Sequence, residues 1–434
     1  MSGLMIAAPS SGSGKTVVTL GLMRAFRRLG VKVSPGKAGP DYIDPAFHAA
    51  ASGQTCHNFD PWAMRPTLLR DQAARSSDQG LLVIEAMMGL FDGAADGTGA
   101  AADLAALLDI PVVLVIDCGR MSQSVAAIAT GFARFRADVR VSGLILNKVG
   151  SARHEAMLRA ALDGTGLTVF GVVRSDPNLQ LPERHLGLVQ AGEHAGLETF
   201  IEAAATAVET GCDLAALLAL AGDRSTPGLI ENAAGIAPLA QHIAVARDIA
   251  FAFSYPHLLE GWRRQGAEVS FFSPLADEAP SQDAGAVYLP GGYPELHAGR
   301  ISSASTFRSG MADAVDRGQR IYGECGGYMV LGEGLVDADG HRHAMLGLLP
   351  LVTTYAERWR HLGYRRLRSL APDLFAGAFT AHEFHYSTVV SEGSAGRLFE
   401  AEDAIGADLG TVGLRHGNVC GSYMHLIDRI GEAA

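Results

Sequence analysis

The chain has 434 residues, of which 48% are hydrophobic and 19% are charged, a composition that is typical of a folded globular protein and leaves little room for a long disordered tail. The formal net charge is −11 at pH 7 and no run of Lys and Arg occurs, which argues against nucleic acid as a partner. No apolar run is long enough to cross a membrane, and the N-terminus lacks the basic start of a signal peptide, so we expect no membrane partner and a cytoplasmic location.

Short apolar runs alternate with helix-length amphipathic segments in the first half of the chain. The apolar runs are residues 4–8, 31–34, 81–85, 112–117, 141–147 and 169–173, and the first amphipathic segment is residues 15–29. Strands that are separated by helices pair in parallel, with the helices on both faces of the sheet. The pattern therefore predicts an α/β domain, which we place at residues 1–220.

Residues 221–241 interrupt this alternation with Gly, Pro, Ser and Asn, and we predict a linker there. A second alternating series follows. Its expected strands are residues 243–246, 269–272, 286–289 and 320–322, and its expected helices are residues 255–265 and 303–317. The series predicts a second doubly wound α/β domain at residues 242–434, whose sheet ends in antiparallel strands within residues 341–420.

A glycine- and serine-rich loop lies between the first predicted strand and the first predicted helix, where a phosphate-binding loop works. Small residues let backbone N–H groups converge on phosphate oxygens, while a lysine reaches the β- and γ-phosphates and a hydroxyl holds Mg²⁺. The residues predicted to bind ATP in this way are Gly12, Ser13, Gly14, Lys15 and Thr16. Pro9 stands where the standard spacing has its first glycine, so the turn must be closed in another way.

Four acidic residues follow predicted strands of the first domain. Asp41 and Asp44 lie in a loop bounded by Gly and Pro, and Glu85 and Asp92 follow the next strand. Ligands bind beyond the carboxyl ends of strands in an open α/β sheet, so these acids are expected to face the nucleotide, although solvated turn residues are the alternative.

Mg²⁺ prefers oxygen ligands, and we predict Thr16, Asp41 and Glu85 as its ligands. Asn147 ends a later predicted strand and is predicted to contact the nucleotide at its base.

A cysteine lies in a glycine-rich turn between a strand and a helix of the second domain. The stretch Gly323-Glu324-Cys325-Gly326-Gly327 is typical of a nucleophile elbow, and the helix N-terminus would favour a thiolate at Cys325. Gly291 and Gly292 end another predicted strand, and their backbone N–H groups are candidates for an oxyanion hole that binds substrate. His425 follows a later strand and is the candidate base. The alternative is that the cysteine and the histidine are ordinary buried residues.

These motifs occur in an order that resembles one family over nearly the whole chain. The chain resembles the cobyrinic acid/hydrogenobyrinic acid a,c-diamide synthase family of corrinoid biosynthesis. Its first domain is similar to the dethiobiotin-synthetase type of P-loop domain, and its second to the class I, Triad-type glutamine amidotransferase domain. The residues that carry the resemblance are Ser10-Ser11-Gly12-Ser13-Gly14-Lys15-Thr16, Lys37-Ala38-Gly39-Pro40-Asp41-Tyr42-Ile43-Asp44-Pro45, Leu289-Pro290-Gly291-Gly292-Tyr293-Pro294-Glu295, Gly323-Glu324-Cys325-Gly326-Gly327 and Gly421-Ser422-Tyr423-Met424-His425.

The resemblance implies a function and a role for each matching position. It implies that ATP and glutamine are used, with Mg²⁺, to amidate the a and c carboxylates of hydrogenobyrinic or cobyrinic acid. The implied roles are phosphate and magnesium binding for Lys15 and Thr16, corrinoid contact for Tyr42, contact with ATP and the substrate carboxylate for Asp41, Asp44, Glu85 and Asp92, nucleophile for Cys325 and base for His425.

The sequence departs from the class I pattern at one position. The usual triad has a glutamate two residues after the histidine, whereas this chain has Ile427 there, so a Cys–His dyad is expected. The segment His382-Glu383-Phe384-His385-Tyr386-Ser387 also matches the family, but we assign it no catalytic role.

Three other functions remain open at this point. Cobyric acid synthase and a nickel-sirohydrochlorin a,c-diamide synthase share both domain types, and a P-loop switch protein with a degenerate second domain belongs to another class. Cys325 and His425 argue against degeneracy. A homodimer is expected from its frequency among oligomers alone.

Overall fold

The computed structural model describes residues 2–179, 183–184, 187–188, 190–193, 196–222 and 233–431. The chain divides into two compact units, an N-terminal unit of Met1–Trp62 and Pro66–Ala233 and a C-terminal unit of Ala63–Arg65 and Ala234–Ala434. Residues 223–232 of the predicted linker at 221–241 lie outside the described residues.

The N-terminal unit alternates strands with helices, as the sequence pattern predicts. Its strands are β1 (Gly3–Ala7), β2 (Val33–Ala38), β3 (His57–Phe59), β4 (Leu81–Glu85), β5 (Val112–Asp117), β6 (Val141–Val149), β7 (Thr168–Arg174), β8 (Glu183–Arg184) and β9 (Gly187–Leu188). Its helices are α1 (Lys15–Arg28), α2 (Asp44–Ser52), α3 (Pro66–Gln79), α4 (Ala101–Leu108), α5 (Ser124–Arg134), α6 (Ala152–Leu162), α7 (Leu197–Gly211) and α8 (Leu214–Ala221), with a 3₁₀ turn at Ala191–Glu193.

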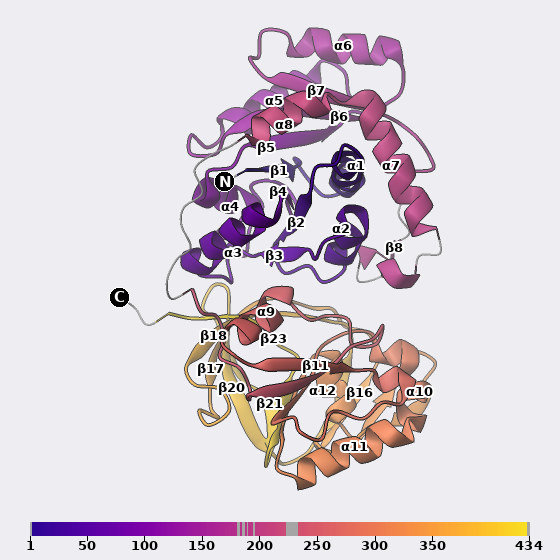
Figure 1. The fold of residues 1–434 in the computed structure, drawn as a ribbon, viewed down its shortest axis with the longest axis vertical. Coiled ribbons are helices and arrows are strands. Elements are labelled where there is room, and N and C mark those ends of the chain that lie inside the picture. The colour runs from indigo at the N-terminus through magenta and orange to yellow at the C-terminus, as the bar shows by residue number, and fades with distance from the viewer. Residues whose placement is uncertain are drawn as a thin grey trace. The chain divides into compact units, whose positions relative to one another are not determined.

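The main sheet of this unit is parallel, in the order β3-β2-β4-β1-β5-β6-β7. Helices α1, α2 and α7 pack together on one face, and α3 and α4 lie on the other, as Figure 1 shows. Strands β1 and β4 are fully buried because both faces of the sheet are covered. Their carboxyl ends meet at one edge, where the loops after β1, β2 and β4 begin.

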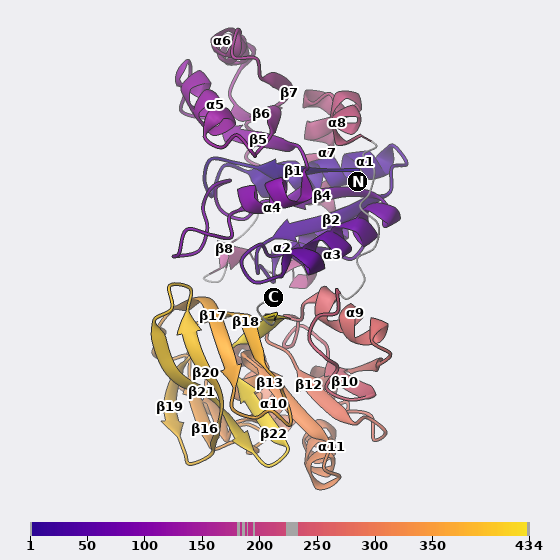
Figure 2. The same cartoon turned by 90° about the vertical axis from the view of Figure 1, so that its left-hand side faces the viewer.

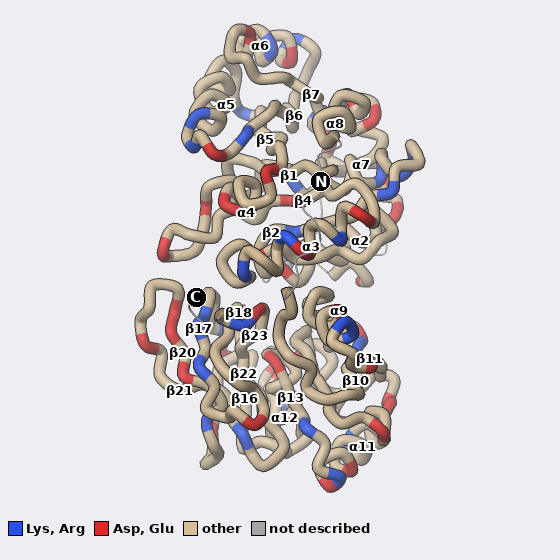
Figure 3. The backbone as a smooth tube through the Cα atoms, turned by 60° about the vertical axis from the view of Figure 1, so that its left-hand side comes forward, with Lys and Arg blue, Asp and Glu red and all other residues tan. Residues whose placement is uncertain are grey.

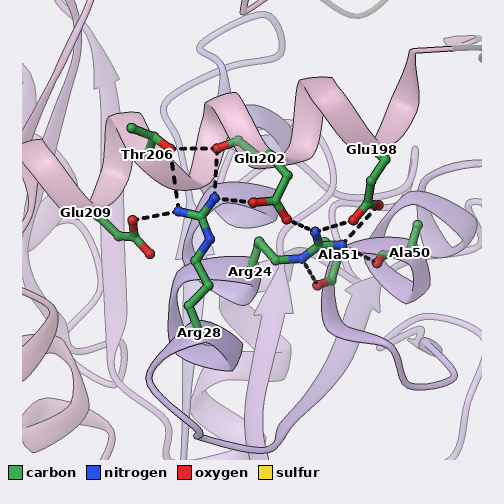
Figure 4. A network of polar contacts seen from close by, with 8 residues as sticks. All are labelled: Arg24, Arg28, Ala50, Ala51, Glu198, Glu202, Thr206 and Glu209. Atoms are coloured by element: carbon green, nitrogen blue, oxygen red, sulfur yellow. Dashed lines mark hydrogen bonds and ion pairs between the residues drawn. The ribbon is translucent and has the colours of Figure 1, made fainter.

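A buried arginine joins the helices on one face of this sheet (Figure 4). The guanidinium of Arg24, on α1, donates hydrogen bonds to the carbonyl oxygens of Ala50 and Ala51 on α2, at 2.9 and 3.0 Å. It also pairs with Glu198 and Glu202 on α7. Arginine suits this place because its planar fork of donors satisfies several acceptors at once. The network fixes α1, the helix that begins at the glycine-rich loop, against its neighbours.

The C-terminal unit is a mixed α/β structure (Figure 2). Its first strands and helices are β10 (His242–Ala246), α9 (Pro256–Arg264), β11 (Glu268–Phe272), β12 (Ala286–Leu289), α10 (Ala298–Ser303), α11 (Ser305–Asp316), β13 (Arg320–Glu324) and α12 (Gly326–Leu331), with 3₁₀ turns at Pro274–Ala276 and Pro294–His297. Its remaining strands are β14 (Gly334–Val336), β15 (Arg342–Ala344), β16 (Leu351–Thr354), β17 (His361–Ser369), β18 (Ala378–His385), β19 (Thr388–Glu392), β20 (Gly396–Asp403), β21 (Asp408–His416), β22 (Val419–Ser422) and β23 (His425–Arg429).

The large sheet of this unit has the order β11-β10-β12-β13-β22-β21-β20-β17-β18-β23. Its first five strands are parallel and the others pair antiparallel, which confirms the predicted antiparallel end. A second sheet has the order β15-β14-β16-β19. The α/β fold class predicted from the sequence is therefore confirmed for both units.

Charges of both signs occur in each unit, as Figure 3 shows along the backbone. Among the described residues, no helix is both long enough and apolar enough to span a bilayer.

A buried carboxylate ties the short segment Ala63–Arg65 to the last strand of the C-terminal unit. The backbone N–H and Nε of Arg65 each donate to Oδ2 of Asp428 at 2.9 Å, and Nη2 donates to Oδ1 at 3.0 Å. Asp428 is fully buried, so these donors replace the water that its carboxylate loses on folding.

We expect Arg65→Met to lower the free energy of unfolding of the C-terminal unit by about 3 kcal/mol, because it leaves the Asp428 carboxylate buried with fewer donors. Denaturant unfolding followed by tryptophan fluorescence measures this change. Arg317→Met, at an exposed position of the same unit, is the matched control and should change stability by less than about 0.5 kcal/mol. Equal stability of the two variants would show that the Arg65 contacts contribute little.

Candidate active sites

The glycine-rich loop after β1 has the backbone of a phosphate-binding loop. Gly12 and Gly14 have φ angles of 79° and 87°, in the left-handed region that glycine adopts readily. A Cβ at Gly14 would lie 2.1 Å from Nδ2 of Asn147, so no side chain fits there. The hydroxyl of Ser13 donates to the carbonyl oxygen of Ser10 at 2.9 Å. The standard loop has a glycine at the position of Pro9, which lets the turn close. In this chain the bond between Ser13 and Ser10 closes the turn instead.

Two residues near the end of β6 donate hydrogen bonds to the backbone of the loop. The side-chain amide of Asn147 donates to the carbonyl oxygen of Ser13 at 2.9 Å. The Nζ atom of Lys148 donates to the carbonyl oxygen of Gly12 at 3.0 Å and pairs with Asp117 at 2.7 Å. Asn147, which the sequence suggests as a nucleotide contact, therefore holds the backbone of the phosphate loop, and it also lines the adjoining cavity.

The phosphate-loop lysine is mostly buried beside this loop. The Nζ atom of Lys15 donates to the carbonyl oxygen of Ser10 at 3.3 Å, and only 7% of the residue is exposed. Burial lowers its pKa, and the negative charge of Glu85 opposes that effect. A phosphate group would add the negative charge that favours the ammonium form.

A second buried lysine lies at the centre of the acidic residues. The Nζ atom of Lys37, on β2, pairs with Oδ2 of Asp44 at 2.5 Å and with Oε1 of Glu85 at 2.9 Å. Burial alone would lower the pKa of Lys37, but the charges of Asp44 and Glu85 outweigh it and raise the pKa above its usual value. Sequence reasoning gave Lys37 no role. The signal was present, because a lysine at the end of a buried strand requires acidic partners.

Glu85, at the end of β4, is held by three side chains. Its Oε1 accepts from the hydroxyl of Thr16 at 2.8 Å as well as from Lys37, and its Oε2 lies 2.6 Å from Nε2 of His48. Burial alone would raise the pKa of Glu85, but Lys37 and His48 outweigh it and hold the pKa well below its usual value. The structure thus brings Thr16 and Glu85, two of the three predicted metal ligands, into direct contact.

The remaining predicted acids surround this pair. Oδ1 of Asp41 accepts the backbone N–H groups of Ile43 and Asp44, at 2.8 and 3.0 Å, which fixes the start of α2. Burial and the nearby charge of Asp41 raise the pKa of Asp44 to about 6. Asp92 is exposed and accepts the backbone N–H of Gly89 at 2.9 Å.

These residues enclose a cavity of about 850 Å³, within the range of small-molecule sites. The predicted residues that line it are Gly12, Gly14, Lys15, Thr16, Asp41, Asp44, Glu85 and Asn147. Lys37 and residues 174–177 also line it, whereas Ser13, Tyr42 and Asp92 lie outside the lining.

The second site is built around a strained cysteine between β13 and α12. Cys325 has φ 47° and ψ −106°, a conformation that non-glycine residues rarely adopt. A Cβ at Gly327 would lie 1.9 Å from the carbonyl oxygen of Leu289, and a Cβ at Gly326 would lie 3.0 Å from the backbone nitrogen of Gly292. The glycines therefore let the elbow pack tightly against the end of β12, as the sequence predicts for a nucleophile elbow.

The structure brings the predicted thiol, base and glycine turn together. A Cβ at Gly291 would lie 2.4 Å from Cε1 of His425, 3.1 Å from its Nε2 and 3.2 Å from Cβ of Cys325. Cys325 is 3% exposed and His425 is fully buried. The Nε2 side of the imidazole therefore faces the same small space as the cysteine.

Burial keeps both reactive groups neutral at pH 7. It raises the pKa of the Cys325 thiol, and the negative charge of Glu295 adds to this effect. Burial also lowers the pKa of His425 to about 3, with further lowering by His382 and His385. A neutral imidazole beside a neutral thiol can accept its proton, which is the requirement for a general base.

The segment that includes His382 and His385 forms a wall of this site. It lies on β18, where the carbonyl oxygen of Phe384 is 3.9 Å from Sγ of Cys325. His382 is paired in register with His425 on β23. Glu383 accepts from Arg365 at 2.6 and 2.9 Å and from His385 at 3.0 Å. The sequence alone did not place this segment at the thiol.

Known protein families match both units. Residues 4–189 match the CobQ/CobB/MinD/ParA nucleotide binding domain, and residues 242–429 match the CobB/CobQ-like glutamine amidotransferase domain. The hydrogenobyrinate a,c-diamide synthase of Rhizobium meliloti (strain 1021) is 66% identical over 430 residues, covering 99% of each chain. A protein of the same name from a Sinorhizobium species is 65% identical and covers 100% of each chain, and one from Rhodobacter capsulatus is 52% identical and covers 98% of each chain.

The raised pKa of Cys325 makes its alkylation depend on pH. We expect iodoacetamide to modify Cys325 slowly at pH 7, with a rate that still increases above pH 9, because the thiolate is the reacting form. Peptide mass spectrometry after timed alkylation measures the rate at each pH. A rate that levels off near pH 7 would mean that the free protein already carries a thiolate at this position.

Proposed function

Because the chain belongs to the hydrogenobyrinate a,c-diamide synthase family, we propose that it uses ATP and glutamine to convert the a and c carboxylates of hydrogenobyrinate into amides. The observation that carries this proposal is the 66% identity to a relative of that name over 99% of both chains. The two sites support it, because amide formation requires both a phosphate site and a source of ammonia.

We also propose a cytoplasmic location, where these small molecules are available, while a homodimer stays a prediction.

The N-terminal site would activate the carboxylate. A carboxylate is a poor electrophile, so its oxygen first attacks the γ-phosphorus of ATP, which releases ADP and leaves an acyl phosphate. Lys15 and the backbone N–H groups of Gly12 to Lys15 would stabilise the transferred charge. Lys37 lies close by as a permanently charged group between Asp44 and Glu85. Ammonia then attacks the acyl carbon, and phosphate leaves.

The oxygen atoms in this site fit a magnesium ion. The hydroxyl of Thr16 and the Oε1 atom of Glu85 are 2.8 Å apart, and Asp41 lines the same cavity. Hard cations prefer such oxygen donors, so Thr16, Asp41 and Glu85 would hold Mg²⁺. When bound, the ion would neutralise charge on the phosphates of ATP.

The substrate carboxylate would lie near the acids at the start of α2. We propose Tyr42, Asp44 and Asp92 as residues that face the corrinoid, as family resemblance implies. The pKa of Asp44, raised to about 6, leaves it mainly ionised at pH 7 and paired with Lys37.

The C-terminal site would release ammonia from glutamine. His425 takes the proton of the Cys325 thiol while the sulfur attacks the side-chain amide carbon of glutamine, and the backbone N–H groups of Gly291 and Gly292 would stabilise the oxyanion. His425 returns the proton to the departing nitrogen. Ammonia is released, and the glutamyl group stays bound to Cys325 as a thioester. Water, deprotonated by His425, then hydrolyses the thioester to glutamate.

Removing one site at a time separates these two roles. We expect Cys325→Ala to abolish synthesis driven by glutamine but to retain synthesis driven by ammonium salts, because the phosphate site is unchanged. Lys15→Ala should remove both, since neither nitrogen source can react with an unactivated carboxylate. Product formation with each nitrogen source measures the two roles. Loss of the ammonia reaction in Cys325→Ala would contradict this division.

The substrate is tested with the purified protein, Mg-ATP and glutamine. We expect hydrogenobyrinic acid to gain two amides, counted by product mass, and cobyrinic acid offered separately to be the poorer substrate. Release of glutamate with no amide on either compound would retain a glutaminase but reject the proposed substrate.

A further inference from the structure

We propose that Glu324, the residue immediately before the nucleophile, is the positioning residue that orients His425 and completes a Cys–His–Glu triad. This inference deepens the function proposed above and rests on it. The usual acidic position, two residues after the histidine, holds Ile427, which is buried and apolar. The chain therefore needs another carboxylate if the imidazole is to be oriented.

The Glu324 carboxylate lies on the side of the imidazole that faces away from the thiol. Its Oε2 atom is 3.7 Å from Nδ1 of His425, and the two residues are 1% and 0% exposed. The Cε1 and Nε2 atoms of the ring instead face Gly291, which also lies beside Cys325. A distance of 3.7 Å is longer than a hydrogen bond, but such bonds in catalytic sites often tighten only when substrate binds.

Three donors hold the carboxylate in this orientation. The hydroxyl of Tyr288 donates to Oε2 at 2.6 Å and the hydroxyl of Tyr322 donates to Oε1 at 3.0 Å. The backbone N–H of Leu426 donates to Oε1 at 3.1 Å. Because Leu426 directly follows His425, the last bond fixes the carboxylate relative to the backbone that carries the imidazole. Hydrogen bonds to a carboxylate also favour its ionised form.

This arrangement selects the tautomer that catalysis needs. With its proton on Nδ1, toward Glu324, His425 presents an unprotonated Nε2 to Cys325. When Nε2 takes the thiol proton, the imidazolium is stabilised by the carboxylate, as the aspartate does in serine protease triads.

Other charged groups near His425 do not replace Glu324. His382 and His385 both lower the pKa of His425 and so oppose the imidazolium. Glu383 favours the imidazolium, but Arg365 and His385 already bind its carboxylate. Burial raises the pKa of Glu324 to about 7, so its charge, and with it the support for the imidazolium, is present above that pH and is lost as the pH falls.

The test is Glu324→Gln, which keeps the shape of the side chain and removes its charge. We expect kcat for glutamine hydrolysis to fall about 100-fold, the lower end of what a positioned base contributes, while KM for glutamine changes less than about threefold. The increase of kcat between about pH 6 and 8 in the wild type should be absent in the variant. Synthesis driven by ammonia should be unchanged, because the phosphate site contains no part of Glu324.

Two further variants separate positioning from folding. Glu333→Gln, at an exposed glutamate of the same unit, is the matched control and should behave as the wild type. Tyr322→Phe removes one donor to Oε1 but keeps the charge, so kcat should fall only a few-fold. A Glu324→Gln enzyme with the kcat and pH profile of the wild type would overturn the proposal, and so would an equal loss of the ammonia reaction, which would reveal a structural role.

The outcome stays separate from that of the substrate test. Glutamine hydrolysis is measured without a corrinoid, so a wild type that hydrolyses glutamine but amidates no corrinoid rejects only the substrate. The comparison of Glu324→Gln with the wild type still decides the role of the carboxylate.

Discussion

The N-terminal site depends on one buried cation, the ammonium of Lys37 between the carboxylates of Asp44 and Glu85. A buried charge is costly unless it is paired, so the strand that carries the lysine must lie beside the acids. Lys37 is the last residue but one of β2, Asp44 begins α2 and Glu85 ends β4, and the paired register of β2 and β4 brings Lys37 opposite Glu85. Because Glu85 also accepts from Thr16 at the start of α1, the same charges position the phosphate loop.

The C-terminal site meets a different constraint, which is a strained backbone held by close packing. The positive φ of Cys325 is unfavourable for a residue with a side chain, and it persists because the surrounding structure determines it. Gly327 contributes by its lack of a Cβ, since a Cβ there would collide with the carbonyl oxygen of Leu289. The elbow thus packs against the end of β12, where Gly291 leaves space for the ring of His425.

Much of this architecture could be predicted from the sequence because apolar runs and glycine-rich turns mark the strand ends. The runs at residues 81–85 and 112–117 became β4 and β5 with the same bounds. The predicted second strand ends at residue 34, four residues before the observed end of β2, because Pro35 and Gly36 are unusual inside a strand. Side-chain partners were harder to predict, since Lys37 and Glu85 are far apart in sequence. The same holds for Glu324 and His425, which are also far apart in the sequence and come close only when the strands that carry them have taken their places in the fold.

The two sites treat charge in opposite ways, and the chemistry of each explains why. In the N-terminal site Lys37 is paired with Asp44 and Glu85, so fixed charges are ready beside the proposed phosphoryl group without reorganisation. In the C-terminal site burial keeps the thiol and the imidazole neutral, which suits the proposed reaction because that reaction begins with a proton transfer between them. A permanent thiolate beside Glu295 would be unfavourable before glutamine enters. Burial therefore makes the thiol weakly reactive at pH 7, and in the proposed reaction His425 takes its proton as the sulfur attacks the amide carbon of glutamine.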